Sequence, residues 1–170
     1  VFGAGGVGLS AIQGARIAGA RQIIAVDIHE SKLAKAKELG ATHIVAERGD
    51  AATAAVRELT DGIGADCVIE CVGTEDARRA AVDVCRPGGM VGLLGVPHGD
   101  LPADAMFWSN KGFHGGVAHV RAYLPHLLEL VLARTINPGR VFDLTLPLSD
   151  VAEGYRAMDE RRAIKAMLIP

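Results

Sequence analysis

The sequence predicts an α/β fold built on a doubly wound parallel sheet. Short apolar runs alternate with helical stretches over most of the 170 residues. Residues 23–26 and 91–94 are apolar without alternation, which is typical of strands covered by helices on both faces. Hydrophobic residues make up 49% of the chain and the net charge is −2, so the composition is that of a globular domain and excludes a disordered tail.

The predicted elements follow one another in strand–helix order up to about residue 118. The strands are predicted at 1–2, 22–27, 43–45, 67–71, 90–95 and 112–117. The helices are predicted at 6–18, 31–39, 51–59 and 74–85. Ser31 and Thr74 are suited to cap two of these helices, and Gly40 is suited to end one in the left-handed conformation.

The last third of the chain has a different pattern. It predicts an amphipathic helix at 121–133, an extended segment at 142–146, a helix at 150–160 capped by Ser149, and a strand at 166–169. Periodicity leaves open whether this tail finishes the same sheet or belongs to a second domain. We therefore divide the chain into residues 1–118 and 119–170.

Composition and charge exclude several classes of partner. The slightly acidic balance and the aromatic content of 4% argue against nucleic-acid binding. No run of 18 apolar residues predicts a membrane span, and the first residues lack the basic region of a signal peptide. Cys67, Cys71 and Cys85 are then best interpreted as reduced thiols, and we expect a cytoplasmic protein.

A glycine-rich loop at residues 3–8 has the spacing G-x-G-x-x-G between a predicted strand and a predicted helix. In such a loop Gly3 allows the tight turn, Gly5 lets the backbone approach a pyrophosphate, and Gly8 lets helix and strand pack closely. The helix N-terminus then offers free N–H groups to the phosphate oxygens. The loop predicts a Rossmann-type dinucleotide site.

Asp27 ends the second predicted strand, 19 residues after Gly8. At this position a carboxylate accepts hydrogen bonds from the adenosine ribose, and it repels the 2′-phosphate of NADP. NAD is therefore the expected cofactor. The turns at 71–74 and 95–97 end two further strands and would present backbone and small side chains to the same flat ligand. An ordinary turn without ligand contact explains either one alone equally well.

These motifs together resemble the cofactor-binding half of the zinc-dependent medium-chain alcohol dehydrogenase family, most closely its bacterial formaldehyde- and threonine-dehydrogenase-like members. The matching stretches span essentially the whole chain: 3–8, 26–28 with Lys32, 38–42, 60–66, 70–73, 86–89 and 146–155.

The resemblance implies a set of NAD-binding residues. Gly5, Gly6, Val7 and Gly8 would hold the pyrophosphate, with Gly3 in the turn, and Asp27 and Lys32 would serve the adenosine ribose. Cys71 and Val72 would line the adenine and ribose wall, while Leu94, Gly95 and Val96 would flank the nicotinamide ribose and carboxamide. His114 would reach the nicotinamide. Lys165 would lie near the pyrophosphate, although a solvated lysine explains that residue equally well.

The resemblance places catalysis elsewhere. In the family a preceding catalytic domain holds the zinc and the proton relay, and the six histidines here are scattered without ligand spacing. We therefore expect no catalytic residue and no metal ligand in this chain, with zinc only in the catalytic domain that it lacks, and we expect residues 119–170 to return to that domain. The implied activity is hydride transfer between an alcohol or aldehyde and nicotinamide. The family also implies a homodimer or homotetramer, formed through an edge strand near 92–96 or 112–117.

Other functions are weighed against this one. A short-chain dehydrogenase needs a lysine four residues after its tyrosine, but Tyr123 and Tyr155 are followed there by Leu127 and Asp159. An S-adenosylmethionine methyltransferase has a similar glycine loop and carboxylate. A zinc-free reductase usually takes NADP, which Asp27 disfavours. The non-enzyme alternative is a dinucleotide-binding module that is catalytically silent alone.

Overall fold

The computed structural model describes all 170 residues and divides them into two compact units, Val1–His119 and Val120–Pro170. Each unit is described by itself. No helix in either unit combines the length and the apolar character needed to cross a membrane.

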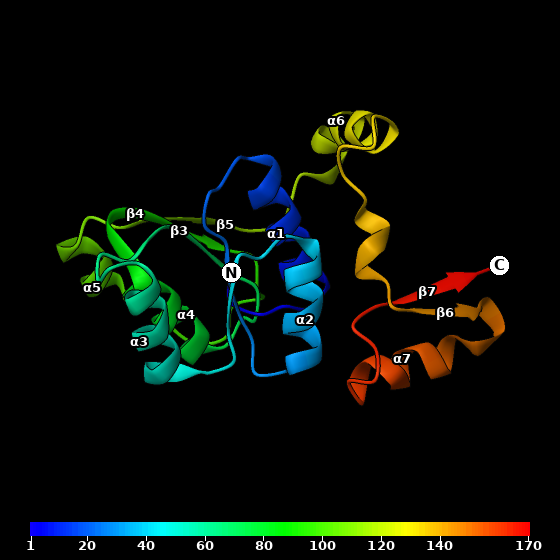
Figure 1. Cartoon of the computed structure of the whole chain (residues 1–170), viewed down its shortest axis with the longest axis horizontal. Coiled ribbons are helices and arrows are strands. Elements are labelled where there is room, and N and C mark those ends of the chain that lie inside the picture. Colours follow the sequence, from blue (N-terminus) through cyan, green and yellow to red (C-terminus); the bar gives the residue numbers. More distant parts are fainter. The chain divides into compact units, whose positions relative to one another are not determined.

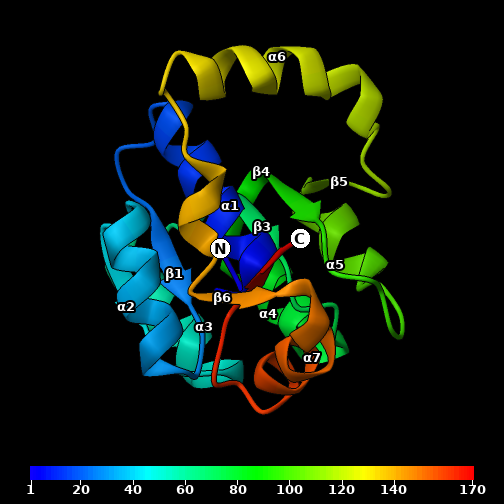
Figure 2. The same cartoon turned by 90° about the vertical axis from the view of Figure 1, so that its right-hand side faces the viewer.

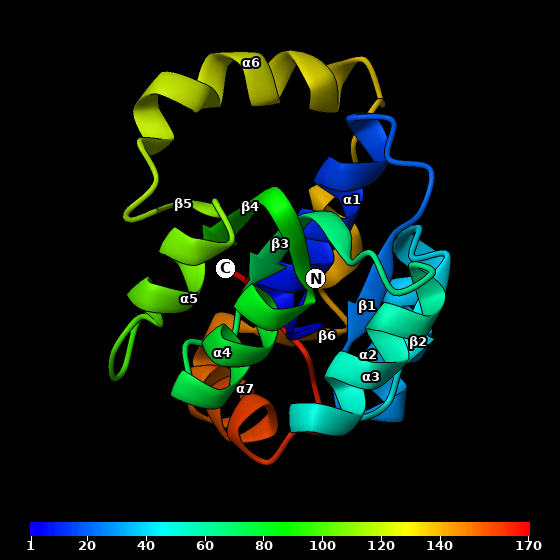
Figure 3. The same ribbon diagram turned by 90° about the vertical axis from the view of Figure 1, so that its left-hand side faces the viewer.

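The first unit is built on one parallel sheet. Its strands are β1 (Ile24–Val26), β2 (His43–Val45), β3 (Ala65–Glu70), β4 (Cys85–Leu93) and β5 (Gly112–Gly115). β1 pairs with β2, and β3, β4 and β5 lie side by side (Figure 3). Phe2 joins the two groups through parallel bridges to Val26 and Glu70. The resulting order, β2–β1–Phe2–β3–β4–β5, confirms the predicted doubly wound sheet, with Phe2 in the central strand position.

Helices cover both faces of this sheet. They are α1 (Gly6–Ile17), α2 (Glu30–Leu39), α3 (Gly49–Leu59), α4 (Glu75–Val84) and α5 (Ala103–Trp108). α1 packs on α2 and α3 packs on α4, and the two pairs lie on opposite sides of the sheet (Figure 1). The sequence did not predict α5, because six residues are too few to establish a helical period.

The core lies between the sheet and these helices. Phe2, Val26, Val68 and Val91 come from the strands and are all buried. They pack in one cluster with residues of α3 and α4, among them Val56, Ala81, Val82 and Val84. Residues 23–26 are buried at four consecutive positions, which explains their non-alternating run, whereas in the run at 91–94 only Val91 is buried and Leu94 is exposed.

The ends of the helices partly follow the predictions. The Thr74 hydroxyl accepts a hydrogen bond from the N–H of Ala77, and Gly40 ends α2 with a φ of 123°, so both predictions are confirmed. The predicted cap at Ser31 is wrong, because α2 begins one residue earlier and Ser31 lies in its first turn. Ser149 is wrong as a cap too, because Asp150 is the N-cap of α7 (Val151–Asp159) and the Ser149 hydroxyl donates to its carboxylate.

The second unit holds the remaining elements. They are α6 (Val120–Leu132), the short 3₁₀ helices η1 (Pro138–Val141) and η2 (Leu148–Asp150), β6 (Leu144–Pro147), α7 and β7 (Ala166–Ile169). β6 and β7 form a parallel pair of their own, and α7 packs against both (Figure 1 and Figure 2). The tail therefore forms a separate two-stranded sheet.

One expectation about sheet edges is corrected. β4 pairs with β3 on one side and with β5 on the other, so the segment near 92–96 is not an edge. β5 forms the edge on this side of the sheet. Its inner side pairs with residues 90–93 of β4, and no strand pairs with its outer side.

Candidate functional site

The glycine loop lies at the carboxyl end of the central strand position, and its three motif glycines are required for different reasons. Gly3 has a φ of 85°, and its N–H donates to the Val26 carbonyl at 2.8 Å. A Cβ on Gly8 would lie 1.7 Å from the Gly3 carbonyl oxygen, so only glycine lets α1 begin this close to the loop. A Cβ on Gly5 would meet nothing within 4 Å. Gly5 therefore borders open space, as an approaching ligand requires.

The N-terminus of α1 lies at this open space. The helix begins at Gly6, its N-cap Gly5 has no side chain to cap it, and its first turn carries no acidic residue. The first N–H groups of a helix have no acceptor within the helix, and the helix dipole adds positive character there. The residues Gly6, Val7 and Gly8 thus form a site suited to an anion such as a phosphate.

Asp27 lies beside the loop, one residue after β1. Its Oδ2 accepts from the Ala4 N–H at 2.8 Å, and its Oδ1 accepts from the His29 N–H at 3.0 Å. Each carboxylate oxygen can accept a second hydrogen bond. The two backbone donors therefore orient a carboxylate that still has capacity for hydroxyl groups.

The turns after β3 and β4 meet each other. A Cβ on Gly73 would lie 2.2 Å from the Val96 carbonyl oxygen, and a Cβ on Gly95 would lie 2.3 Å from the Gly73 nitrogen. These two glycines are therefore required by contact between the turns. This contact is an ordinary structural role of a turn, which the sequence leaves open beside the approach of a ligand.

Glu70 supports both turns and was not singled out from the sequence. Its side chain is fully buried, and Oε1 accepts from the N–H groups of Val72 at 2.6 Å and Gly73 at 2.8 Å. Its backbone carbonyl accepts from Leu94 and Gly95. The signal for this role was present in the sequence, since an acidic residue ends an otherwise apolar strand just before a glycine turn.

A sequence profile described as zinc-binding dehydrogenase matches residues 6–128 of this chain. The chain belongs to the zinc-binding dehydrogenase family. Alcohol dehydrogenase 2 of Tanacetum cinerariifolium is 30% identical over 99% of the chain, which covers 46% of that protein. Thus the chain spans about half the length of the curated relatives it matches.

Solved structures of the zinc-binding dehydrogenases have the same fold. The alcohol dehydrogenase TADH from Thermus sp. ATN1 superposes with a TM-score of 0.91 at 34% identity, covering 99% of this chain and 50% of that chain. Benzyl alcohol dehydrogenase from Acinetobacter calcoaceticus gives a TM-score of 0.82 at 30% identity, covering 98% of this chain and 48% of the other. The resemblance stated from the motifs is thereby confirmed.

The family is named for a zinc ion, but this chain contains no set of side chains arranged to bind one. No group of three or more His, Cys, Asp or Glu side chains is arranged to hold a metal ion. Since zinc sites use three or four such ligands, the residues present do not fit a zinc ion.

The remaining predicted site residues are distributed over both units. Leu94 and Val96 are exposed after β4, and His114 is exposed on the neighbouring strand β5. Lys32 lies in the first turn of α2, and no hydrogen bond joins it to Asp27. Lys165 belongs to the second unit, where its backbone N–H donates to Asp143. Their contacts with a cofactor stay predictions.

An apolar groove of about 460 Å³ lies at the opposite end of the sheet. The starts of β1 and β3 line it, together with Val1, Ala18 and Val84. Ligands of doubly wound sheets bind at the carboxyl ends of the strands. We therefore do not assign this groove to the cofactor.

Cys71, in the turn after β3, is predicted to be a slow-reacting thiol. Burial raises its pKa to about 11, and the neighbouring Glu70 carboxylate acts in the same direction. Since the thiolate is the reactive form, iodoacetamide at pH 8 is expected to alkylate the exposed Cys67 well before Cys71 or the buried Cys85. Peptide mass spectrometry after timed quenching gives the three rates.

The pH dependence of this labelling provides its control. Below pH 11 the Cys71 thiolate fraction is expected to rise about tenfold per pH unit, and its alkylation rate with it. Labelling of Cys71 at the rate of Cys67 at pH 8 would contradict its burial in the turn.

Proposed function

We propose that this chain binds NAD(H) and forms the cofactor-binding part of an alcohol dehydrogenase. The observation that carries the proposal is the open space at Gly5, bordered by the free N-terminus of α1 and by the oriented Asp27 carboxylate. A dinucleotide needs these features together, because its pyrophosphate is anionic and its ribose carries hydroxyl donors.

The pyrophosphate would lie over Gly5, where the N–H groups of Gly6, Val7 and Gly8 can donate to it. Nothing within 4 Å of a Cβ position obstructs this approach. Asp27 would accept hydrogen bonds from the adenosine ribose, and Lys32, Cys71 and Val72 would line the same end of the cofactor. The Asp27 charge would repel a 2′-phosphate, which is the basis for proposing NAD rather than NADP.

The nicotinamide end would lie against the turn after β4, flanked by Leu94, Gly95 and Val96. His114, on the next strand, would reach the nicotinamide. When bound, NAD accepts a hydride from the substrate or, in its reduced form, donates one. This chain's own residues bind and orient the cofactor for that exchange.

The wider activity is proposed from the relatives. They are alcohol dehydrogenases, so the substrate would be a small alcohol or aldehyde. Residues 119–170 would contribute to a catalytic domain that also holds the zinc, and copies would associate through β5 into a homodimer or homotetramer. A cytoplasmic location stays a prediction. Because this chain has no metal-ligand cluster, we expect it to be catalytically silent alone.

Isothermal titration of the chain with NADH tests the proposal directly. NADH and ADP-ribose are expected to bind, and NADPH is expected to bind about tenfold or more weakly, since a 2′-phosphate would face the Asp27 carboxylate. S-adenosylmethionine is the control ligand for the methyltransferase alternative. Binding of S-adenosylmethionine without NADH would overturn the proposal.

A further inference from the structure

Arg78, on the first turns of α4, is buried to an unusual degree for an arginine. Only 1% of its surface is exposed, although charged side chains are seldom fully buried without partners. Its Nε has no hydrogen-bond partner in the structure. An apolar side chain of similar length would fill the same space without a buried unpaired donor, so packing alone does not account for Arg78.

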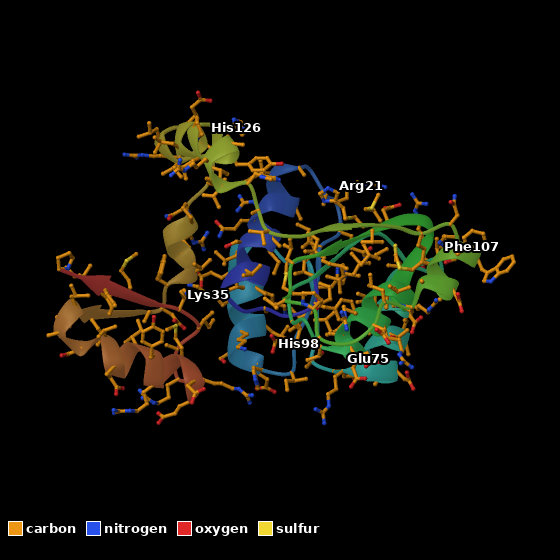
Figure 4. The ribbon with its side chains drawn as sticks, turned by 180° about the vertical axis from the view of Figure 1, so that it is seen from behind. Arg21, Lys35, Glu75, His98, Phe107 and His126 are labelled. Atoms are coloured by element: carbon orange, nitrogen blue, oxygen red, sulfur yellow. The ribbon has the colours of Figure 1, made fainter.

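The partner that Arg78 does have lies in the turn after β4. Its Nη2 donates to the backbone carbonyl of His98. The next residue, Gly99, has a φ of 86°, and a Cβ there would lie 2.9 Å from Glu75 Oε2 and 3.2 Å from Arg78 Nη2. The side chains of α4 therefore lie directly against residues 98–99 (Figure 4, which labels Glu75 and His98).

The same turn is held at two further points. The His98 N–H donates to the Gly73 carbonyl at 3.1 Å, and Gly95 and Val96 pack on the backbone of Gly73. Gly73 in turn donates to the buried carboxylate of Glu70. Residues 95–99 are thus fixed by backbone contacts at one end and by the Arg78 guanidinium at the other.

The side chain of Val96 lies on a solvent-exposed side of this turn. The Val96 side chain is 73% exposed, although its backbone is packed against Gly73. A valine held by its backbone with its side chain exposed can form a rigid wall for a flat ring, because little further ordering is needed when a ligand arrives.

We propose that Arg78 is a positioning residue for the nicotinamide end of the cofactor. It holds the His98 carbonyl, and through it the outer part of residues 95–99, so that the exposed Val96 side chain lies against the nicotinamide ring. A guanidinium suits this role because its charge strengthens the hydrogen bond to the carbonyl. The inference rests on the proposed function, since it needs NAD(H) to bind at the glycine loop.

Two ligands separate this role from a merely structural one. NADH reaches the turn after β4, whereas ADP-ribose has the adenosine, pyrophosphate and second ribose but no nicotinamide. Arg78→Met keeps an unbranched side chain and removes the donor. It is expected to weaken NADH binding about tenfold in isothermal titration while ADP-ribose affinity changes by no more than about twofold.

The matched control is Arg79→Met. Arg79 is the next residue on α4 and pairs at the surface with Glu75 at 3.2 Å, so its loss is expected to change neither affinity. Arg78→Lys keeps the charge but not the planar fork, and it is expected to shift the ratio of NADH to ADP-ribose affinity in the same direction by about threefold. That ratio is measured on Arg78→Lys if Arg78→Met does not fold.

The outcomes distinguish the two proposals. Equal losses of NADH and ADP-ribose affinity, or an unchanged ratio in every Arg78 variant that folds, overturn the role of Arg78. Failure of the unmodified chain to bind either ligand overturns the proposed function instead.

Discussion

Replacing Gly5 by alanine is expected to weaken NADH binding about 100-fold or more while leaving the fold intact, because the methyl group would enter the space proposed for the pyrophosphate and displace its charge-assisted hydrogen bonds. Gly5 has a φ of −77°, which alanine adopts readily, and its Cβ would meet nothing within 4 Å. The poorer N-cap costs no more than about 1 kcal/mol of stability. Calorimetric titration with NADH and thermal unfolding measure the two effects.

Gly8→Ala is the matched control within the same motif. Its Cβ would lie 1.7 Å from the Gly3 carbonyl oxygen, which is backbone and cannot rotate away. We therefore expect Gly8→Ala to lower the free energy of unfolding by about 3 kcal/mol or more, measured by urea denaturation. NADH affinity of Gly5→Ala equal to that of the unmodified chain would contradict a pyrophosphate over Gly5.

Asp27→Ala is expected to weaken NADH binding about 10- to 100-fold, since hydrogen bonds from ribose hydroxyls to a charged carboxylate are lost. NADPH binding is expected to fall less or to rise, because the repulsion of its 2′-phosphate is removed at the same time. The ratio of the two affinities is thus the decisive measurement. A ratio unchanged by Asp27→Ala would contradict the ribose role.

The structure adds a stability cost to this variant. Asp27 accepts from the N–H of Ala4, a residue only 1% exposed, so Asp27→Ala leaves a buried donor unpaired and costs about 1–3 kcal/mol of unfolding free energy. Affinities are therefore compared at a temperature where circular dichroism shows the variant folded. Glu30→Ala, which removes an exposed carboxylate from the first turn of α2, controls for the loss of charge.

Local sequence patterns predicted most of the fold of this chain. The predicted bounds of β2 and β7 match the observed ones, and those of α1, α2 and α4 differ from the observed ones by no more than two residues at either end. Strand and helix periods, glycine turns and the glycine loop are all properties of neighbouring residues, so they are visible without the tertiary structure. α5 escaped because its helical segment is too short to show a period.

The glycine loop and Asp27 of the candidate site were likewise predicted from the sequence, because their positions depend on neighbouring residues. The spacing from Gly3 to Gly8 and on to Asp27 reflects one turn, one helix and one strand, and the structure brings those residues together. Glu70 and Arg78 were missed. Their partners are backbone groups of turns that fold back on them, in the case of Arg78 from 20 residues away.

The sequence by itself determined the order of strands and helices, the glycine loop and the carboxylate beside it, because each depends on contacts along a short stretch of chain. Only the tertiary structure decided that β4 is an inner strand, that Gly73 and Gly95 are needed for their mutual contact, and that Arg78 is buried beneath the turn after β4. These features depend on which distant segments the parallel sheet brings side by side. Local composition does not specify that pairing, because the same apolar runs suit any inner position of the sheet.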